Sequence, residues 1–331
     1  MDGIAMKTDT RHVRIGSRGS DLALWQARWV ASALREKLPT LEISVEIIRT
    51  TGDNVLDSPL SAIGDKGLFT KEIEQALLEE RIDLAVHSLK DLPTELPDGL
   101  ILGAVTRRED VRDVFIPHPS NMCRTLLGQP EGASIATGSL RRRCQLLHLR
   151  PDFEIIELRG NLNTRLRKLE ESTWAGMILA RAGVVRLGWE RVIGETIPAE
   201  TVLPAVGQGA LGIEIRTRDR RVAGLVAGLT HVPTKQATMA ERALLRRMEG
   251  GCQIPLGAYG RMDMSDDQVP FLQLDAMVGS LDGKTVVRGK IHGDPVDADK
   301  LGRHLADTLL AGGGARLLES IRKGMVSHEP V

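Results

Sequence analysis

Along the first third of the chain, short apolar runs alternate with longer segments in which apolar residues recur every three or four positions. The short runs predict strands at 13–15, 41–47 and 84–86, and the longer segments predict helices at 21–38 and 69–81. This strand–helix order is typical of an α/β unit built on a mostly parallel sheet.

The same alternation resumes near residue 112 and predicts a second α/β unit. Its expected elements are strands at 135–136, 154–158 and 177–180, and helices at 140–149 and 164–169.

After Pro204 the pattern changes. The glycine-rich segment 207–212 runs into the alternating residues 213–215, which indicates a crossing between domains. Beyond residue 232 the chain predicts a third, α+β unit. Its expected elements are one long helix, a hairpin of strands 272–278 and 285–291 with the turn signal Asp282-Gly283, and a final helix at 299–310.

Composition limits the function classes. A chain of 331 residues is expected to form two or three domains, and its 42% hydrophobic content is sufficient for their cores. Lys+Arg and Asp+Glu number 44 each, so no global positive field attracts nucleic acid or an anionic membrane. Any basic site must therefore be local, and we expect neither nucleic acid nor membrane as a partner.

Cysteine, histidine and terminal patterns are consistent with the cytoplasm. Three cysteines cannot form a disulfide framework, and residues 1–12 lack the apolar stretch of a signal peptide. No apolar run is long enough to span a membrane. The eight histidines are scattered, so no metal site is expected.

Two glycine motifs resemble nucleotide sites but lack the required context. Gly207, Gly209 and Gly212 spell G-x-G-x-x-G, yet a strand rather than a helix is expected to follow. The segment from Gly279 to Thr285 is one residue too short for a phosphate loop, and the predicted hairpin accounts for it.

Cationic and hydroxyl side chains recur at six junctions between predicted strands and helices, where open α/β sheets bind ligands. They are Arg18 with Ser20, Lys66, Ser88 with Lys90, Ser139 with Arg141 and Arg142, Arg159 with Arg165, and Arg186.

Arg141 and Arg142 are expected in a first helical turn, where the helix dipole disfavours cations unless an anion binds there. Each arginine alone could be solvated or paired with a nearby Asp or Glu. Six such places together favour a cleft for a multiply carboxylated ligand, and arginine suits planar carboxylates. From these residues alone the chain is either an enzyme or a binder.

Two residues could supply chemistry. Asp91 follows a predicted strand beside Lys90, although it could equally cap a turn before Pro93. Cys252 lies on a Gly-Gly loop after a helix for which Thr238 and Glu241 have capping-box spacing. Its alternative is a small buried hydrophobic residue, the role expected of Cys144 on an apolar helix face.

From about residue 13 to 318 the chain resembles the porphobilinogen deaminase (hydroxymethylbilane synthase) family, and eight segments carry the resemblance. They are Arg14-Ile15-Gly16-Ser17-Arg18, Leu22-Ala23-Leu24-Trp25-Gln26-Ala27, Gly64-Asp65-Lys66-Gly67-Leu68-Phe69, Ala85-Val86-His87-Ser88-Leu89-Lys90-Asp91-Leu92-Pro93, Gly138-Ser139-Leu140-Arg141-Arg142, Leu158-Arg159-Gly160-Asn161, Leu203-Pro204-Ala205-Val206-Gly207-Gln208-Gly209-Ala210 and Glu249-Gly250-Gly251-Cys252-Gln253.

The resemblance implies two α/β lobes like those of periplasmic binding proteins and a smaller α+β C-terminal domain. Carried onto this chain, lobe 1 spans 10–107 with 207–228, lobe 2 spans 112–203, and the C-terminal domain spans 232–325 and carries the cofactor cysteine.

The resemblance also implies an activity. Four porphobilinogen molecules lose ammonia and condense stepwise onto a dipyrromethane primer, one per chain, and water releases hydroxymethylbilane for tetrapyrrole biosynthesis. The implied enzyme is a cytoplasmic, monomeric transferase. The alternative is a non-catalytic two-lobed carboxylate-binding protein, which leaves Cys252 and the third domain unexplained.

By the same resemblance, Asp91 is catalytic and Cys252 holds the dipyrromethane covalently. The other implied cofactor-binding residues are Lys66, Ser88, Lys90, Ser139, Arg141, Arg142 and Arg159, and the implied substrate-binding residues are Arg18, Ser20, Arg165 and Arg186. Ala62 stands where some members have a second lysine, which puts one carboxylate contact in doubt.

Overall fold

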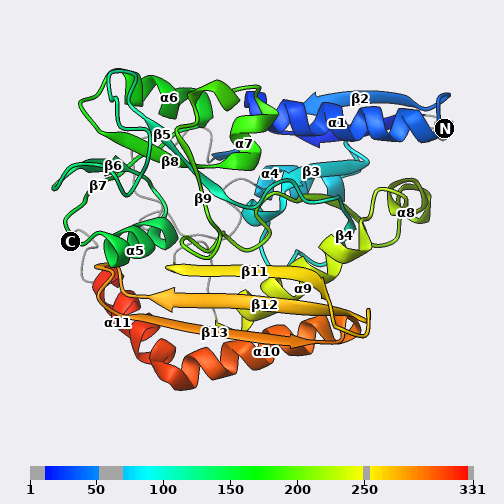
Figure 1. Cartoon of the computed structure of the whole chain (residues 1–331). Coiled ribbons are helices and arrows are strands. Elements are labelled where there is room, and N and C mark those ends of the chain that lie inside the picture. The colour runs from blue at the N-terminus through cyan, green and yellow to red at the C-terminus, as the bar shows by residue number, and fades with distance from the viewer. Residues whose placement is uncertain (1–11, 52–69, 249–253, 327–331) are drawn as a thin grey trace, which may run out of the picture.

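The computed structural model describes residues 12–51, 70–248 and 254–326. These residues form two five-stranded sheets and one three-stranded sheet. Figure 1 shows the two larger sheets side by side, with the small sheet beneath both of them. The expected fold class, two α/β lobes and a smaller α+β domain, is confirmed.

The first sheet, in lobe 1, has the strand order β2-β1-β3-β10-β4. Its strands are β1 (His12–Ser17), β2 (Glu42–Ile47), β3 (Leu84–Ser88), β4 (Leu100–Val105) and β10 (Leu211–Arg216). Helices α1 (Asp21–Lys37) and α8 (Arg220–Ala227) bury Val30, Leu34 and Val222 against one face. Helix α4 (Lys71–Leu78) packs with Ile82, Ala85 and Leu100 in a separate cluster.

The second sheet, in lobe 2, has the matching order β7-β6-β8-β5-β9. Its strands are β5 (Asp113–Pro117), β6 (Ser134–Ala136), β7 (Glu154–Ile156), β8 (Gly176–Ala180) and β9 (Glu195–Ile197). Its helices are α5 (Leu140–Leu149), α6 (Leu162–Glu170) and α7 (Arg181–Arg186), with a 3-10 turn η2 (Glu190–Val192). Leu146 of α5 and Leu169 of α6 lie in two different core clusters of this lobe.

The chain crosses between the lobes twice, at 106–112 and at 198–210. Each crossing delivers a strand that lies antiparallel in the next sheet: β5 beside β8, and β10 between β3 and β4. The predicted crossing near 207–212 is therefore confirmed. Strand β10 rather than a helix follows these glycines, so the G-x-G-x-x-G match has no helix N-terminus for a pyrophosphate.

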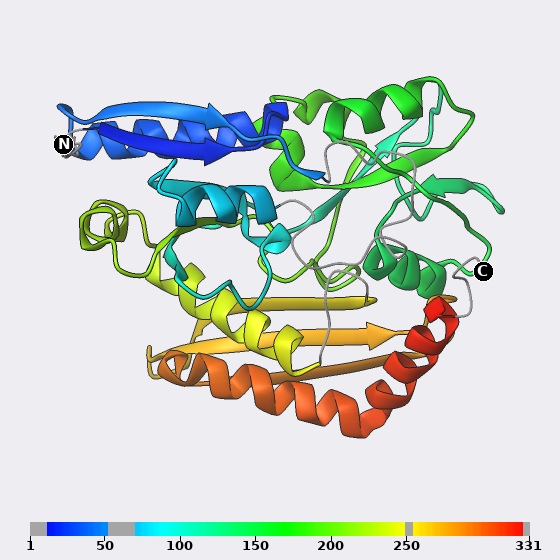
Figure 2. The same cartoon turned by 180° about the vertical axis from the view of Figure 1, so that it is seen from behind.

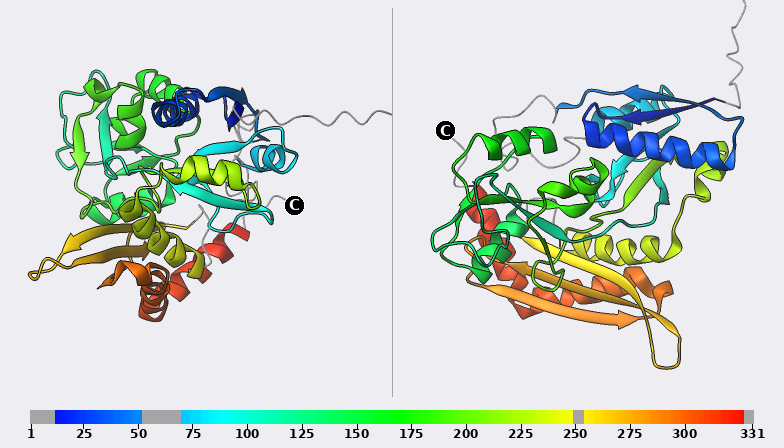
Figure 3. Two further views of the ribbon diagram at one scale, coloured as in Figure 1. Left: turned by 90° about the vertical axis from the view of Figure 1, so that its right-hand side faces the viewer. Right: turned by 45° about the horizontal axis from the view of Figure 1, so that its top comes forward.

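The C-terminal domain packs helices on one face of the third sheet. Its elements are α9 (Val232–Arg247), β11 (Leu256–Met264), β12 (Pro270–Gly279), β13 (Val286–Gly293), η3 (Pro295–Asp297), α10 (Ala298–Leu309), the π segment η4 (Leu310–Gly314) and α11 (Ala315–Val326). Leu244, Leu274 and Leu305 join α9, β12 and α10 in one core. Figure 2 shows these helices from behind, and Figure 3 shows the β11–β12 hairpin reaching past the lobes.

The predicted hairpin is confirmed, because β12 and β13 pair antiparallel on either side of Asp282-Gly283. Strand β11, which completes the three-stranded sheet, was not expected. The expected capping box at Thr238 and Glu241 is wrong, because both residues lie inside α9, which begins at Val232 after the N-cap His231. Inside the helix the Thr238 hydroxyl donates to the Thr234 carbonyl at 2.8 Å. None of the described helices combines the length and apolar character that a membrane span requires.

Candidate active site

Ser88, Lys90 and Asp91 follow the carboxyl end of β3. Strand β3 ends at Ser88, and the 3-10 turn η1 (Leu89–Asp91) buries Leu89 and leaves Asp91 exposed. Gln26 Nε2 on α1 donates to Ser88 Oγ at 2.7 Å and orients that hydroxyl. Within the described parts of the chain, the Asp91 carboxylate accepts no hydrogen bond. Asp91 ends a turn before Leu92 and Pro93, as the alternative expected, but its side chain caps no element there.

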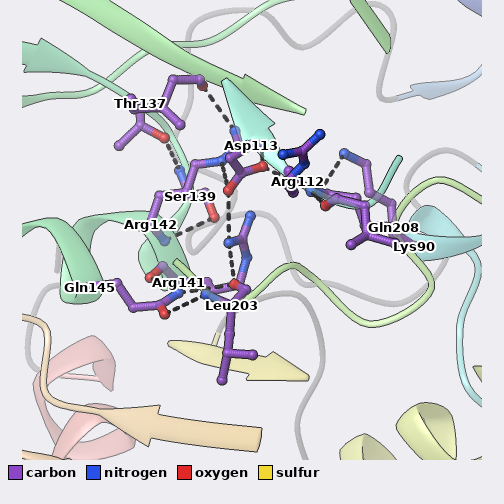
Figure 4. A network of polar contacts seen from close by, with 12 residues as sticks. Lys90, Arg112, Asp113, Thr137, Ser139, Arg141, Arg142, Gln145, Leu203 and Gln208 are labelled. Carbon is purple, nitrogen blue, oxygen red and sulfur yellow. Dashed lines mark hydrogen bonds and ion pairs between the residues drawn. The ribbon is translucent and has the colours of Figure 1, made fainter. Parts of the chain in front are cut away.

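A buried carboxylate, Asp113 at the start of β5, organises the arginines of lobe 2 (Figure 4). Arg142 Nη2 lies 2.8 Å from Asp113 Oδ1, and Arg141 Nη1 lies 2.9 Å from Asp113 Oδ2. Arg142 also donates to the Ile178 carbonyl at 3.0 Å, and Arg141 to the Leu203 carbonyl at 2.6 Å. These guanidiniums lower the pKa of Asp113 against the opposing effect of burial, so its charge is retained.

For Arg141 and Arg142, the alternative of pairing with an acidic residue holds. Both are buried, at 4% and 5% exposure, and share the Asp113 carboxylate. The anion that offsets the α5 dipole is thus supplied by the neighbouring strand. One carboxylate faces two guanidiniums, so the cluster keeps a positive charge.

Gln208, from the second crossing, links this cluster to lobe 1. Its Nε2 donates to Asp113 Oδ1 at 2.9 Å and to the Val111 carbonyl at 2.7 Å. Its Oε1 lies 3.5 Å from Lys90 Nζ. Burial lowers the pKa of Lys90 to about 8, and repulsion from Arg142 adds to this shift while Asp91 opposes it. Burial likewise lowers the pKa of Arg165 to about 10.

A cavity of about 60 Å³ lies between the lobes. It brings together five of the predicted site residues: Ser88 and Lys90 from lobe 1, and Arg142, Arg165 and Arg186 from lobe 2. No acidic residue is among those that line it. Four cations around a space without an acid form a site for carboxylate or another anion.

Arg186 reaches this cavity from the last turn of α7, not from a helix start. Its Nη2 donates to the Gly209 carbonyl at 2.6 Å, and its guanidinium lies 5.6 Å from the centre of the Trp25 ring. Both partners belong to lobe 1, so this side chain crosses the gap between the lobes. Burial lowers its pKa to about 10.

The other predicted residues that the structure describes do not line the cavity. Ser20 and Ser139 serve as N-caps of α1 and α5, accepting from Ala23 N and Arg142 N, each at 3.4 Å. Arg159 Nε lies 3.4 Å from Glu157 Oε1 at the edge of lobe 2. Arg18 is half-buried after β1. Lys66 and Cys252, and with them Ala62, lie outside the described residues.

Two residues of the site were not singled out from the sequence. Asp113 directly precedes the apolar run Val114 to Ile116, and an acid at the start of a buried strand is a signal of a buried partner. Gln208 lies inside a glycine-rich segment that was interpreted only as a crossing. No group of histidine, cysteine and acidic residues in the described ranges is arranged to hold a metal ion.

Two α/β lobes around a cationic cavity, with a third domain beneath, define the class of two-lobed proteins whose shared cavity suits an acidic ligand. Comparison with known proteins identifies the family. The model described as porphobilinogen deaminase, dipyromethane cofactor binding domain, matches residues 13–224, and that of the porphobilinogen deaminase C-terminal domain matches residues 235–311. The chain therefore belongs to the porphobilinogen deaminase family, whose members are transferases.

Curated relatives agree over nearly the whole chain. The porphobilinogen deaminase of Desulforamulus reducens is 48% identical over 94% of this chain and 98% of its own length. The enzyme of Chlorobium phaeobacteroides is 50% identical over 93% of this chain and 97% of its own length. The enzyme of Geobacter sulfurreducens is 48% identical over 96% of this chain and 97% of its own length.

Solved structures of two-lobed binding proteins are similar to the lobes only distantly. The periplasmic VFT2 domain of Bordetella pertussis BvgS has a TM-score of 0.39 at 10% identity, covering 66% of this chain and 86% of that one. The probable amino-acid transporter binding protein YtmK of Bacillus subtilis has a TM-score of 0.38 at 10% identity, over 66% and 89%. Neither likeness bears on function.

Proposed function

We propose that this chain joins four porphobilinogen molecules into hydroxymethylbilane in the cytoplasm, acting as a monomer. One observation carries the proposal: four cations and no acid line the cavity between the lobes, next to the exposed Asp91. Porphobilinogen carries an acetate and a propionate, so a growing chain of such units is a polyanion. A cationic cavity beside one acidic residue suits both its binding and its chemistry.

The donor set fits the carboxylates of a dipyrromethane as well as those of the substrate. We propose that Lys90, Arg142 and Ser88 hold the cofactor together with Lys66, Ser139, Arg141 and Arg159, with Cys252 as the covalent attachment. When bound, the cofactor supplies the chain end to which substrate is added. We propose that Arg165 and Arg186, with Arg18 and Ser20, bind the substrate. Arg141 acts at a distance in this scheme, because its guanidinium already binds Asp113 and Leu203.

Asp91 is the proposed catalytic residue. As ammonia leaves the aminomethyl group of porphobilinogen, positive charge develops on its pyrrole ring. A carboxylate fixed on η1 stabilises that charge without reorganising. The same Asp91 oxygens then accept the proton that the new carbon–carbon bond releases.

The three sheets support a division of the chain into lobe 1 at 10–107 with 207–228, lobe 2 at 112–203 and a C-terminal domain at 232–325. Under this proposal both crossings act as the hinge on which the lobes move between additions.

The experiment that tests the proposal is a product balance. Purified full-length protein is incubated with porphobilinogen, and ammonia and hydroxymethylbilane are measured. We expect four ammonia molecules for each hydroxymethylbilane released. A carboxylate binder would retain porphobilinogen unchanged, so recovery of intact porphobilinogen without ammonia would overturn the proposal.

A further inference from the structure

The C-terminal sheet has one face covered by helices and another that faces the lobes. On the second face Tyr259, Asp275 and Lys290 are aligned across β11, β12 and β13. Lobe 2 covers part of it, where Leu203 and Cys144 pack with Met277 and Tyr259. Beside this contact a hollow of about 320 Å³ remains, which we call the sheet pocket.

The sheet pocket has an apolar floor and a cationic rim. Ala199 and Leu203 of lobe 2 and the ring of Tyr259 line it, and they are joined by Arg288 and Lys290 of β13. Arg108 and Arg261 hold the Tyr259 ring, with their guanidiniums 5.6 and 5.1 Å from its centre.

Of the three cations at the rim, one forms an ion pair with an acid that also lines the pocket, and two do not within the described residues. Arg261 is paired with Asp275, and both line the pocket. Arg288 Nη1 approaches only the Glu200 carbonyl oxygen, at 3.4 Å, and Lys290 forms no ion pair with any residue in the described ranges. Two cations two residues apart on one strand thus face the single remaining acid, Glu200. The rim retains a positive charge above an apolar floor.

We propose that the sheet pocket binds a small aromatic carboxylate. Its volume falls in the range of roughly 300–1,000 Å³ typical of small-molecule sites. An aromatic ring would pack on Leu203 and against Tyr259, and the carboxylate would accept hydrogen bonds from Arg288 and Lys290. The pocket shares no lining residue with the cavity at Lys90, so the proposal goes beyond the proposed function.

Occupancy of the sheet pocket has a structural consequence. The ligand would contact both the 198–203 segment, which begins the second crossing, and the C-terminal sheet. A molecule that binds both surfaces favours the arrangement in which they are packed together. A neighbouring hollow of about 520 Å³ shares Ala199, Glu200, Tyr259 and Arg261 and extends to the first crossing at Arg108. The site is therefore placed to influence lobe movement.

The test uses 2-naphthoate as the probe, titrated calorimetrically into the full chain. The double variant Arg288→Ala/Lys290→Ala removes both rim cations, which are exposed and outside the catalytic machinery. The matched control Lys300→Ala/Arg303→Ala removes two exposed cations from α10, away from the pocket. Neutral 2-naphthamide reports the contribution of the apolar floor alone.

We expect saturable binding of one naphthoate per chain, weakened about fivefold or more by Arg288→Ala/Lys290→Ala, the scale of two partly exposed charge contacts. The control variant should bind as the native chain does, and 2-naphthamide should bind more weakly. Both variants should keep native turnover. Absence of saturable binding, equal affinity for the amide, or equal affinity of the two double variants would overturn the proposal; the last result would place naphthoate in the cavity at Lys90.

Discussion

Asp113 determines what the arginines of lobe 2 can do. It is fully buried and holds two guanidiniums at once, so one positive charge of the pair stays uncompensated next to the cavity. A buried ion pair of this kind adds little net stability, but breaking it is costly. The arrangement fixes the direction of Arg142 while leaving the site cationic.

Asp91→Asn should leave the protein folded and lower turnover at least about 100-fold, the effect of removing one preorganised charge. The amide has nearly the same shape but cannot neutralise a cation. Steady-state formation of hydroxymethylbilane measures the effect. Asp98→Asn, a change at an exposed acid in the following turn, is the control and should retain native turnover. Native turnover in folded Asp91→Asn protein would remove Asp91 from the mechanism.

Arg142→Leu and Arg159→Leu should differ sharply in stability. Arg142 is 5% exposed and bidentate on Asp113, so its loss should lower the free energy of unfolding by about 3 kcal/mol. Among the described residues, the ion pair of Arg159 is a 3.4 Å contact with the largely exposed Glu157, so its loss should cost less than about 1 kcal/mol. Urea unfolding of both variants measures the difference, and equal midpoints would contradict this assignment.

Lys90 should give the enzyme an alkaline limit. Burial lowers the pKa of Lys90 to about 8, so its charge, and with it carboxylate binding, is lost as pH rises through that value. We expect kcat/KM for porphobilinogen to fall above about pH 8, and Lys90→Arg to move the fall to higher pH because guanidinium stays charged. An unchanged profile in Lys90→Arg would assign the limit to another group.

Stability has the opposite pH dependence. Between about pH 8 and the ordinary lysine value of 10.5, the unfolded chain binds the Lys90 proton and the folded chain does not. The contribution of Lys90 to the free energy of unfolding therefore rises with pH in this window.

The cations of the site could be predicted from the sequence, but Asp113, the acidic partner of Arg141 and Arg142, could not. Residue type and position next to a strand predicted Lys90, Arg142, Arg165 and Arg186 as neighbours. The Asp113 pairing depends on β5 lying beside β8, an antiparallel contact formed by a crossing. A pattern of neighbouring residues in the sequence cannot predict a contact between strands that are far apart in the chain.

At the scale of elements, α9 joins the C-terminal domain to both crossings through one residue. Glu241 is fully buried and accepts hydrogen bonds from Gly207 N at 2.6 Å and Gly260 N at 2.8 Å. It also pairs with Arg108, with Nη1 2.6 Å from Oε1. Gly207, Arg108 and Gly260 belong to the second crossing, the first crossing and β11. Helix α9 thereby holds the two crossings between the lobes together.

Glu241→Gln should lower the free energy of unfolding by about 3 kcal/mol, because Arg108 would remain buried without a counter-charge. Glu319→Gln on α11 removes an exposed pair with Lys323 and should change it by less than about 0.5 kcal/mol. Chemical denaturation of both proteins gives the comparison. If Glu241→Gln unfolds at the native midpoint, the α9 connection does not stabilise the packing of the two crossings.

The regular elements were largely predictable because their apolar periodicity is local. Helix α5 has the predicted bounds, and α1 ends one residue earlier than expected. The Thr238–Glu241 spacing was misleading because a capping box is only a sequence pattern, whereas His231 and Pro233 provide the actual helix start. That interpretation assigned Glu241 to a helix cap. The burial of Glu241 instead reflects its tertiary contacts with Arg108, Gly207 and Gly260.

At the scale of the whole molecule, the site exists only where the lobes meet. Ser88 and Lys90 come from one lobe, and Arg142 and Arg165 from the other. The βα pattern predicted that each set would lie at a ligand-binding edge of its own sheet. That the edges face each other follows from the two crossings and from α9, which the sequence pattern alone did not specify.

The proposed attachment of a dipyrromethane to Cys252 is tested most directly by intact mass spectrometry of the denatured protein. We expect a mass above that of the 331-residue chain, because a thioether survives denaturation and thiol reductants, and peptide mapping should place it on the peptide containing Cys252. Cys252→Ser should lose the added mass and the activity together. Cys144→Ser should keep both, since Cys144 is fully buried among Leu203 and Met277. A fully active protein with an unmodified Cys252 would contradict the account.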